Sequence, residues 1–337
     1  MTTEAPQLPS RAKAPKVPVT ILTGFLGAGR TTLLSRILSE RLDERIAVIK
    51  NEFGPEGVDN ELLLSAGPAQ IVEMNNGCVC CTVRGDLVRI LGQLVQRSET
   101  AATRLDRVII ETTGLADPAP VAQTFFMDDH VAAHFTLDAI VTVVDALHAY
   151  GQLDAHHEAQ EQVGFADRIL LSKSDLVGSL QCERLRQRLR RMNPRAPIRS
   201  VHFGATPITD LLDVAGFSLE HVLEIEPGFL GEETHDHDDA IRAFAFATER
   251  NFDADRLQAF FRDTLAAHGP NLLRYKGIVA FAGLDHRIVL QGVYMLMNSD
   301  AGRAWRTAEQ RESKLVFIGR NLPEAALRTA LESCMAP

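Results

Sequence analysis

The feature that most constrains the fold is a strand, a glycine-rich turn and a helix in immediate succession near the N-terminus. Residues 17–24 (VPVTILTG) are apolar and β-branched and end in glycine, which predicts a buried strand. Helical spacing of apolar residues then runs from Thr31 to about Leu42. This order of elements is typical of the βα units from which mostly parallel sheets are built.

The turn between this strand and this helix is a candidate phosphate-binding loop. Residues 24–31 match the pattern G-x-x-x-x-G-K-[ST] everywhere except at Arg30, which stands in place of lysine. Glycines let backbone N–H groups converge on phosphates, and the helix N-terminus adds positive potential. The Thr31 hydroxyl would bind Mg²⁺. A glycine-rich turn with no ligand is the alternative, which the flanking strand and helix disfavour. The residues expected at the nucleotide are Gly24, Phe25, Leu26, Gly27, Ala28, Gly29, Arg30, Thr31 and Thr32.

Arg30 is the unusual position of this loop. Lysine is a compact point charge, whereas arginine is longer, planar and forked, although it too is always charged. Arginine can attract a triphosphate without reaching the point where charge develops during phosphoryl transfer. We therefore expect nucleotide binding to survive better than hydrolysis.

The sequence SKSD at 172–175 predicts the site of the nucleotide base. It follows the apolar strand 169–171. The Asp175 carboxylate can accept hydrogen bonds from N1–H and the exocyclic amine of guanine, a pair that adenine does not offer. The Lys173 stem would lie along the base, beside Ser172. Taken alone, the sequence SKSD is most simply a polar turn after a strand. Because it lies downstream of a phosphate loop and at the end of a later strand, the pattern favours a guanine-binding site.

Two further candidate residues lie at the C-terminal end of the stretch 106–114 (DRVIIETTG), which contains a predicted strand. Glu111 ends the apolar run, where an acid near the Mg²⁺ shell is expected. Gly114 would offer its backbone N–H to the γ-phosphate. With Arg30 and Thr31, these residues complete the predicted catalytic set. Asp117, before Pro118, is instead suited to cap the next helix.

Three cysteines lie within four positions, at Cys78, Cys80 and Cys81. Cysteines this close in the sequence cannot form disulfides that cross-link distant parts of the fold. Their thiolates are favoured ligands of Zn²⁺ and similar metals. One or two more ligands would come from elsewhere, with His134 and His202 as candidates, or the site is open. The alternatives are a small-residue turn with inert thiols and a redox sensor that uses Cys80 and Cys81.

The chain divides into two domains. A tail at 1–16 precedes a nucleotide-binding domain at 17–222, in which five more strands are predicted. An acidic linker at 223–240 contains HDHDD, which is either a weak metal tether or a solvated segment. A smaller α+β domain at 241–337 follows, with four predicted strands and two helices. The further strands are predicted within 45–54, 106–114, 138–146, 167–175 and 196–204, and then within 241–248, 278–282, 288–295 and 314–319.

Bulk properties exclude several classes of function. The net charge of −9 argues against a nucleic-acid coat or a binder of anionic membranes. No apolar run reaches the length of a membrane span, and the first residues lack a signal-peptide core. Clustered cysteines suit a reducing compartment, so we expect a cytoplasmic protein.

Taken in order, these motifs resemble the CobW-like P-loop GTPases, a group of metallochaperones. The resemblance includes NEFG at 51–54, NGCVCC at 76–81 and ETTGLADP at 111–118, with the phosphate loop and SKSD. It extends to that family's C-terminal domain, in LLRYKGIV, VLQGVY and LVFIGRNLP at 272–279, 289–294 and 315–323.

The resemblance implies GTP hydrolysis with Mg²⁺ and delivery of zinc or cobalt to a client metalloprotein. It implies phosphates on 24–32, guanine on Ser172, Lys173 and Asp175, and metal on Cys78, Cys80 and Cys81. The segment 51–81 would be the switch between nucleotide and thiols. The oligomeric state stays open, with a dimer among the options.

This chain departs from the family pattern at two positions. Arg30 replaces the lysine, and Pro55 stands where many members carry an acid after NEFG. The first departure leaves a second hypothesis open, that of a degenerate guanine-nucleotide-binding scaffold with little hydrolysis.

Overall fold

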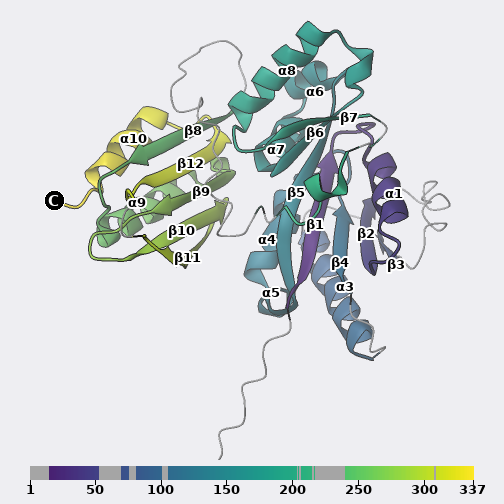
Figure 1. Cartoon of the computed structure of the whole chain (residues 1–337), viewed down its shortest axis with the longest axis horizontal. Helices are drawn as coiled ribbons and strands as arrows, with labels where there is room; N and C mark the ends of the chain where they lie inside the picture. Colours follow the sequence, from purple (N-terminus) through teal and green to yellow (C-terminus); the bar gives the residue numbers. More distant parts are fainter. Residues whose placement is uncertain are drawn as a thin grey trace, which may run out of the picture.

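The computed structural model describes residues 15–52, 70–75, 81–100, 105–202, 204, 206–214, 216, 240–306 and 309–337. They form two sheet-based domains side by side (Figure 1). The first is an α/β domain with a parallel sheet, and the second is a smaller domain with an antiparallel sheet. This architecture confirms the predicted fold class. Among the helices of the described residues, none is both long and apolar enough to cross a membrane.

The first sheet has seven parallel strands in the order β3-β2-β4-β1-β5-β6-β7. The strands are β1 (Val17–Gly24), β2 (Ile46–Glu52), β3 (Gln70–Asn75), β4 (Arg107–Glu111), β5 (Phe135–Asp145), β6 (Arg168–Ser172) and β7 (Ile198–Val201). Six of them were predicted. β3 was not, because the sequence QIVEMN has no long apolar run.

Helices cover both faces of this sheet (Figure 1). Leu33, Leu34, Ile37 and Leu38 of α1 pack on one face, against a cluster that includes Val48 and Ile109. The other face packs against α3, α4, α5 and α7. The helices are α1 (Arg30–Glu40), α3 (Cys81–Thr100), α4 (Ala119–Met127), α5 (Asp129–His134), α6 (Ala149–Ala155), α7 (His157–Phe165) and α8 (Ser179–Met192).

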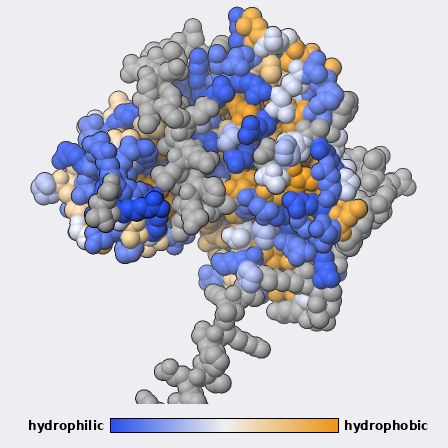
Figure 2. Space-filling view, viewed as in Figure 1, coloured by the Kyte–Doolittle hydropathy of each residue, from blue (hydrophilic) through white to orange (hydrophobic). Residues whose placement is uncertain are grey.

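The second sheet is antiparallel, in the order β11-β10-β9-β12-β8. Its outer face packs against two helices through an aromatic cluster that includes Phe261, Tyr275 and Phe317. In Figure 2 the surface of this domain is largely hydrophilic, as expected where aromatic rings lie inside a sheet–helix layer. The elements are β8 (Ile241–Thr248), α9 (Ala254–His268), β9 (Arg274–Val279), β10 (His286–Val293), β11 (Leu296–Ala304), β12 (Ser313–Arg320) and α10 (Glu324–Ser333).

The inner face of the second sheet packs against the first domain. Ala245, Val316 and Ile318 belong to the same hydrophobic cluster as the core of the first sheet. Gly164 of α7 permits this approach, because a Cβ there would lie 3.0 Å from Leu273 Cδ2. The two domains therefore share one continuous core.

Polar contacts also cross this junction. Arg320 Nη2 lies 2.8 Å from Glu161 Oε1, and Arg274 pairs with Asp167. The Tyr294 hydroxyl donates to Asp117 Oδ2 at 3.3 Å. This last contact joins the second domain to the loop between Glu111 and α4, so the junction reaches a loop of the predicted nucleotide site.

Candidate functional site

The phosphate loop has the backbone geometry that its glycines suggest. Gly27 and Gly29 have φ of 74° and 101°, in the left-handed region that side chains other than glycine rarely adopt. At Gly24 a Cβ would collide with the carbonyl oxygen of Val143 on the neighbouring strand β5. At each of these three positions a side chain would be strained or would collide, so glycine is required. The turn that they form joins the end of β1 to the start of α1.

Two residues of the predicted catalytic set, Thr31 and Glu111, meet beside this loop. Thr31 Oγ1 donates to Glu111 Oε1 at 3.4 Å, which joins the first turn of α1 to the end of β4. Glu111 is 5% exposed. A hydroxyl and a carboxylate are hard oxygen donors of the kind that Mg²⁺ prefers, so these two residues fit a magnesium site.

Arg30 reaches the same strand end by a different route. Its Nη1 donates to the carbonyl oxygen of Thr112, one residue beyond Glu111. The Thr112 hydroxyl donates in turn to Thr23 Oγ1 at 2.8 Å. The guanidinium is therefore directed at the backbone of the 111–118 loop, which shows how the longer arginine differs from a lysine that has one donor group at its tip.

Gly114 lies against the phosphate loop. A Cβ at this position would be 2.6 Å from Leu26 Cδ2 and 2.8 Å from the Leu26 backbone nitrogen. The buried Gln162 amide donates to the carbonyl oxygens of Gly114 and Ala116, both at 3.1 Å. This loop is thus held at close range to the phosphate loop by a side chain of α7. Gln162 was not predicted, because nothing in its local sequence distinguishes it from any other helical glutamine.

The predicted base site lies at the end of β6. Ser172 Oγ donates to the Ala28 carbonyl oxygen at 2.7 Å, which ties the base end to the phosphate loop. Lys173 has φ of 55°, and its Nζ lies 2.7 Å from Asp145 Oδ2. Asp175 is half exposed, and its carboxylate lies 3.2 Å from His202 Nδ1. Of the three predicted base-site residues, Ser172 contacts the phosphate loop, whereas Lys173 contacts Asp145 and Asp175 lies beside His202.

Asp145, the last residue of β5, has a structural role beside the predicted base site. Burial favours its neutral form, but hydrogen bonds from Lys173, His148 and the Leu147 backbone lower the pKa of this carboxyl below its ordinary value. The charged carboxylate fixes Lys173 in place. Asp117 likewise accepts a hydrogen bond from the Ala119 N–H at the start of α4, at 2.9 Å, as expected of a capping acid.

Only one of the three clustered cysteines lies among the described residues. Cys81 begins α3, whereas Cys78 and Cys80 fall outside the described part of the chain. The segment that carries them directly follows β3, whose last residue, Asn75, pairs with Glu52 of β2. Since all seven strands are parallel, β3 ends at the same carboxyl edge of the sheet as β1, which leads into the phosphate loop. β3 and β1 are three strand spacings apart, or about 14 Å.

The histidines proposed as additional metal ligands make other contacts. His134 Nδ1 lies 2.9 Å from the His130 carbonyl oxygen, and His202 lies beside Asp175. Within the described ranges, no group of three or more His, Cys, Asp or Glu side chains is arranged to hold a metal ion.

Two sequence families match this architecture. The family described as CobW/HypB/UreG, nucleotide-binding domain, matches residues 18–200, which is more than half of the chain. This chain belongs to that family. The family described as Cobalamin synthesis protein cobW C-terminal domain matches residues 241–335. The predicted resemblance to CobW-like proteins is confirmed over both domains.

Relatives of this CobW-family chain span nearly its whole length. The zinc chaperone YjiA of Escherichia coli (strain K12) is 39% identical over 317 residues, covering 93% of this chain and 97% of that protein. The zinc chaperone CobW of a Sinorhizobium species is 34% identical, covering 96% and 98%. The crystal structure of Zn(II)-bound YjiA GTPase from E. coli superimposes with a TM-score of 0.78 at 32% identity, covering 96% of this chain and 100% of that one.

Proposed function

We propose that this CobW-family chain binds and hydrolyses GTP and delivers zinc, or cobalt, to a client metalloprotein. The metal cargo would bind at Cys78, Cys80 and Cys81. The observation that carries the proposal is that β1, which leads into the phosphate loop, and β3, which precedes the cysteines in the sequence, end at the same carboxyl edge of one parallel sheet. The zinc chaperone names of relatives that match both domains support it.

The phosphate end would perform the hydrolysis. Backbone N–H groups of 24–32 would bind the phosphates, while Thr31 and Glu111 would hold Mg²⁺. When bound, Mg²⁺ supplies positive charge against the negative charge of the β- and γ-phosphates. The backbone of Gly114, held against Leu26 by its close approach and by Gln162, would meet the γ-phosphate. The guanine base would lie at Ser172, Lys173 and Asp175, because only the guanine edge offers two donors to a carboxylate.

Nucleotide and metal would be coupled through the strand ends between their sites. Loops at one sheet edge that are ordered by a γ-phosphate and released on hydrolysis form a common switch. Binding free energies that are coupled in this way are reciprocal, so Zn²⁺ must change GTP affinity by the factor by which GTP changes Zn²⁺ affinity.

Titration of Zn²⁺ into nucleotide-free protein and into protein bound to a non-hydrolysable GTP analogue tests this coupling. We expect a difference in Zn²⁺ affinity of about 5- to 150-fold, the usual range of coupling between sites. The double substitution Cys80→Ser and Cys81→Ser should abolish the tight Zn²⁺ site. Cys182→Ser, at a free cysteine of α8, is the matched control and should keep it. Equal Zn²⁺ affinities in the two nucleotide states would refute the coupled mechanism.

A guanine-nucleotide-binding scaffold with little hydrolysis is the second candidate, and the contact of Arg30 with the Thr112 carbonyl favours it. Phosphate release by the parent and by Arg30→Lys separates the two. If the arginine limits hydrolysis, the lysine variant should turn over GTP on the order of tenfold faster or more, with GTP affinity little changed, because one well-placed charged donor can contribute that much to the rate. If the lysine variant is no faster, the arginine is not what limits the rate.

The redox alternative has its own test. Metal delivery should persist under reducing conditions, and a protein that needs Cys80 and Cys81 to oxidise should lose function there.

A further inference from the structure

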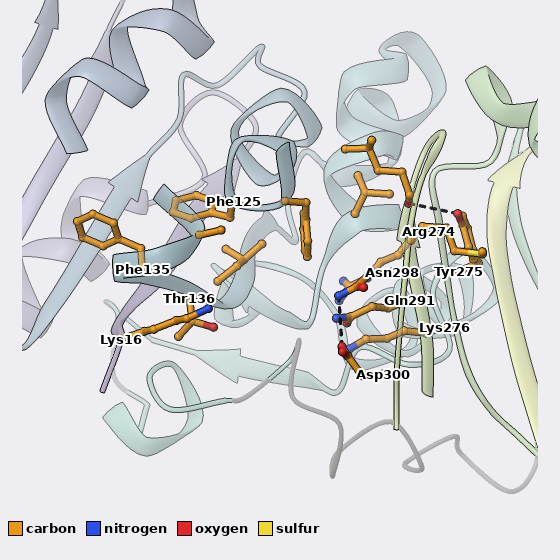
Figure 3. Close-up of a pocket in the computed structure, with 17 residues that line it drawn as sticks. Lys16, Phe125, Phe135, Thr136, Arg274, Tyr275, Lys276, Gln291, Asn298 and Asp300 are labelled. Atoms are coloured by element: carbon orange, nitrogen blue, oxygen red, sulfur yellow. Dashed lines mark hydrogen bonds between the residues drawn. The ribbon is translucent and has the colours of Figure 1, made fainter. Parts of the chain in front are cut away.

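A cavity of about 450 Å³ lies between the two domains, away from the phosphate loop. One wall comes from α4, α5 and the start of β5, and the other is the inner face of β9, β10 and β11 (Figure 3). Its volume falls in the range of sites that hold small organic ligands, roughly 300–1000 Å³. None of the predicted nucleotide or metal residues lines it.

A row of polar side chains crosses the inner face of the second sheet at this cavity. Val316, Lys276, Gln291 and Asn298 are successive cross-strand partners on β12, β9, β10 and β11. At the β12 end the row is apolar and packs on the first domain, whereas from Lys276 onward it is polar and lines the cavity. In Figure 3 Lys276, Gln291 and Asn298 lie together on this wall. Cross-strand neighbours of this kind lie within reach of one ligand group, about 5 Å apart.

Burial makes this row unusual. Lys276 is 3% exposed and Gln291 is 9% exposed, on the face of the sheet that also packs Val316 and Ile318 against the first domain. A buried ammonium and a buried amide are costly where apolar residues would serve, which indicates a use for their hydrogen bonds. Three donor-bearing side chains in a line suit a ligand with several acceptor oxygens.

The charges around the cavity favour an anion. Arg195 and Asp167 line a smaller cavity beside it, which shares Arg274 and Lys276 with the first. Asp167 is engaged by Arg274, and Asp300 accepts a hydrogen bond from Asn298. Basic side chains outnumber carboxyl side chains by four to two among the described residues that line the two cavities. These charged residues are Lys16, Arg195, Arg274 and Lys276, with Asp167 and Asp300.

The opposite wall is apolar. Phe125 of α4 and Phe135 and Leu137 of β5 are buried at the cavity, and Phe126 lies beside them. Figure 3 shows Phe125 and Phe135 on the side of the first domain, across from the polar row. A ligand that meets both walls needs a charged end and an apolar body.

We propose that this interdomain cavity binds a small organic anion, with its carboxylate or phosphate at Lys276, Gln291 and Asn298 and its apolar body against Phe125 and Phe135. The site is separate from the proposed GTP and metal sites, and its test requires neither ligand.

The protonation of Lys276 provides a signature of such binding. Burial, with the neighbouring charges of Arg274 and Arg195, lowers the pKa of Lys276 well below its ordinary value, and Asp167 opposes this shift. A bound anion raises the pKa of the same ammonium again. Between the free and the bound pKa, each binding event therefore takes up a proton, and affinity falls as the pH rises. Below the free pKa the ammonium is already charged, and affinity no longer depends on its titration.

The probe is 2-naphthoate, a flat aromatic carboxylate that carries no phosphate and so does not imitate the nucleotide. Calorimetric titration into nucleotide-free, full-length protein should show binding at one site, with affinity that falls as the pH rises. Titrations in buffers of different ionisation enthalpy should show net proton uptake. Naphthalen-2-ylmethanol has the same apolar body without the charge, and it should bind on the order of tenfold or more weakly, because a charge-assisted hydrogen bond is lost.

Lys276→Met removes the charge and keeps the length of the side chain. It should weaken 2-naphthoate binding about tenfold or more, abolish proton uptake and leave binding of the neutral alcohol unchanged. Lys314→Met is the matched control, because Lys314 is on the adjacent strand β12 and does not line the cavity. Absence of 2-naphthoate binding to the parent overturns the proposal. So does equal affinity of the parent for the acid and the alcohol, a result that does not depend on whether the Lys276 variant folds.

Discussion

The two sheets of this molecule keep their polar groups in different places. In the parallel sheet the residues predicted at the nucleotide lie at the carboxyl edge, where Thr31, Glu111 and Ser172 end or face strands. In the antiparallel sheet a polar row crosses the middle of a buried face, at Lys276 and Gln291. A residue at an edge can change without disturbing the core, whereas a residue on a packed face cannot.

The junction between the domains lies between these two cases. Asp117 belongs to the loop that approaches the phosphate loop, yet its partner Tyr294 comes from the end of β10. One substitution at the carboxyl edge, one within the antiparallel sheet and one at the junction therefore test whether the three regions respond differently.

The largest effect is expected from Gly114→Ala, at the edge. Its Cβ would lie 2.8 Å from the Leu26 backbone nitrogen, so the 111–118 loop must move away from the phosphate loop. A shift of about 1 Å in a positioning group can lower a rate about 100-fold, so GTP turnover should fall by about that factor. The melting temperature should stay within a few degrees of the parent.

Gly151→Ala, in α6, is the control for this substitution, because no atom lies within 4 Å of its Cβ. It should leave turnover unchanged. If Gly114→Ala instead lowered stability as much as a core substitution does, the separation between edge and core would be wrong.

Gly292→Ala, within the antiparallel sheet, should show the opposite pattern. Its Cβ would collide with the Tyr275 ring, which lies over Gly292 and whose hydroxyl donates to the Leu296 carbonyl oxygen at 3.2 Å. Overpacking of this kind costs about 1–3 kcal/mol of unfolding free energy, measurable by urea denaturation. GTP affinity should stay within about twofold of the parent, because Tyr275 packs in the outer aromatic cluster.

Gly302→Ala, in β11, is the matched control, since its nearest neighbours would be 3.4 Å away. It should cost well under 1 kcal/mol, as is usual for a substitution without a named steric cause. A large loss of GTP affinity in Gly292→Ala would show that the antiparallel sheet controls the nucleotide site directly.

The effect of Asp117→Asn, at the junction, is of similar size to that of Gly292→Ala at neutral pH, and it is lost at low pH. Burial raises the pKa of Asp117 from 3.8 to about 6; the Ala119 N–H opposes this shift and the like charge of Glu161 adds to it. A carboxyl with a raised folded pKa destabilises the fold progressively as the pH rises from about 4 to about 6, and the cost is complete above that range. The asparagine variant escapes this cost, so at pH 7.5 it should be more stable than the parent by about 1–3 kcal/mol.

Near pH 3 the two proteins should have similar free energies of unfolding, because Asp117 and its unfolded counterpart, whose pKa is 3.8, are then both largely protonated. Asp145→Asn is the control of opposite sign, since hydrogen bonds to Lys173 and His148 lower the pKa of Asp145 and its charge is stabilising at neutral pH. Lower stability of Asp117→Asn at pH 7.5 would mean that the contact with Tyr294 needs the charge.

The sequence was a good guide to the buried strands, and the two strands that it missed, β3 and β11, both lie at a sheet edge, although the edge strands β7 and β8 were predicted. β1, β4 and β5 are continuous apolar runs because both of their faces are covered. β11 was not predicted, because seven of its nine residues are exposed and LMNSDAGRA has no apolar alternation. β11 is held in the sheet by backbone hydrogen bonds to β10, and such bonds impose little pattern on the side chains of the sequence.

What the sequence determined by itself is the phosphate loop, the α/β fold and the family. Positive φ at Gly27 and Gly29, and the strand and helix on either side, are properties of a few neighbouring residues, and the residue types report them directly. Only the tertiary structure decided that Gln162 holds the 114–116 backbone, that Tyr294 meets Asp117 across 177 positions, and that Lys276 lines a cavity between domains. Those contacts depend on how the two sheets pack against each other. Packing brings together side chains that are far apart in the sequence, and no regular spacing along the chain reveals them.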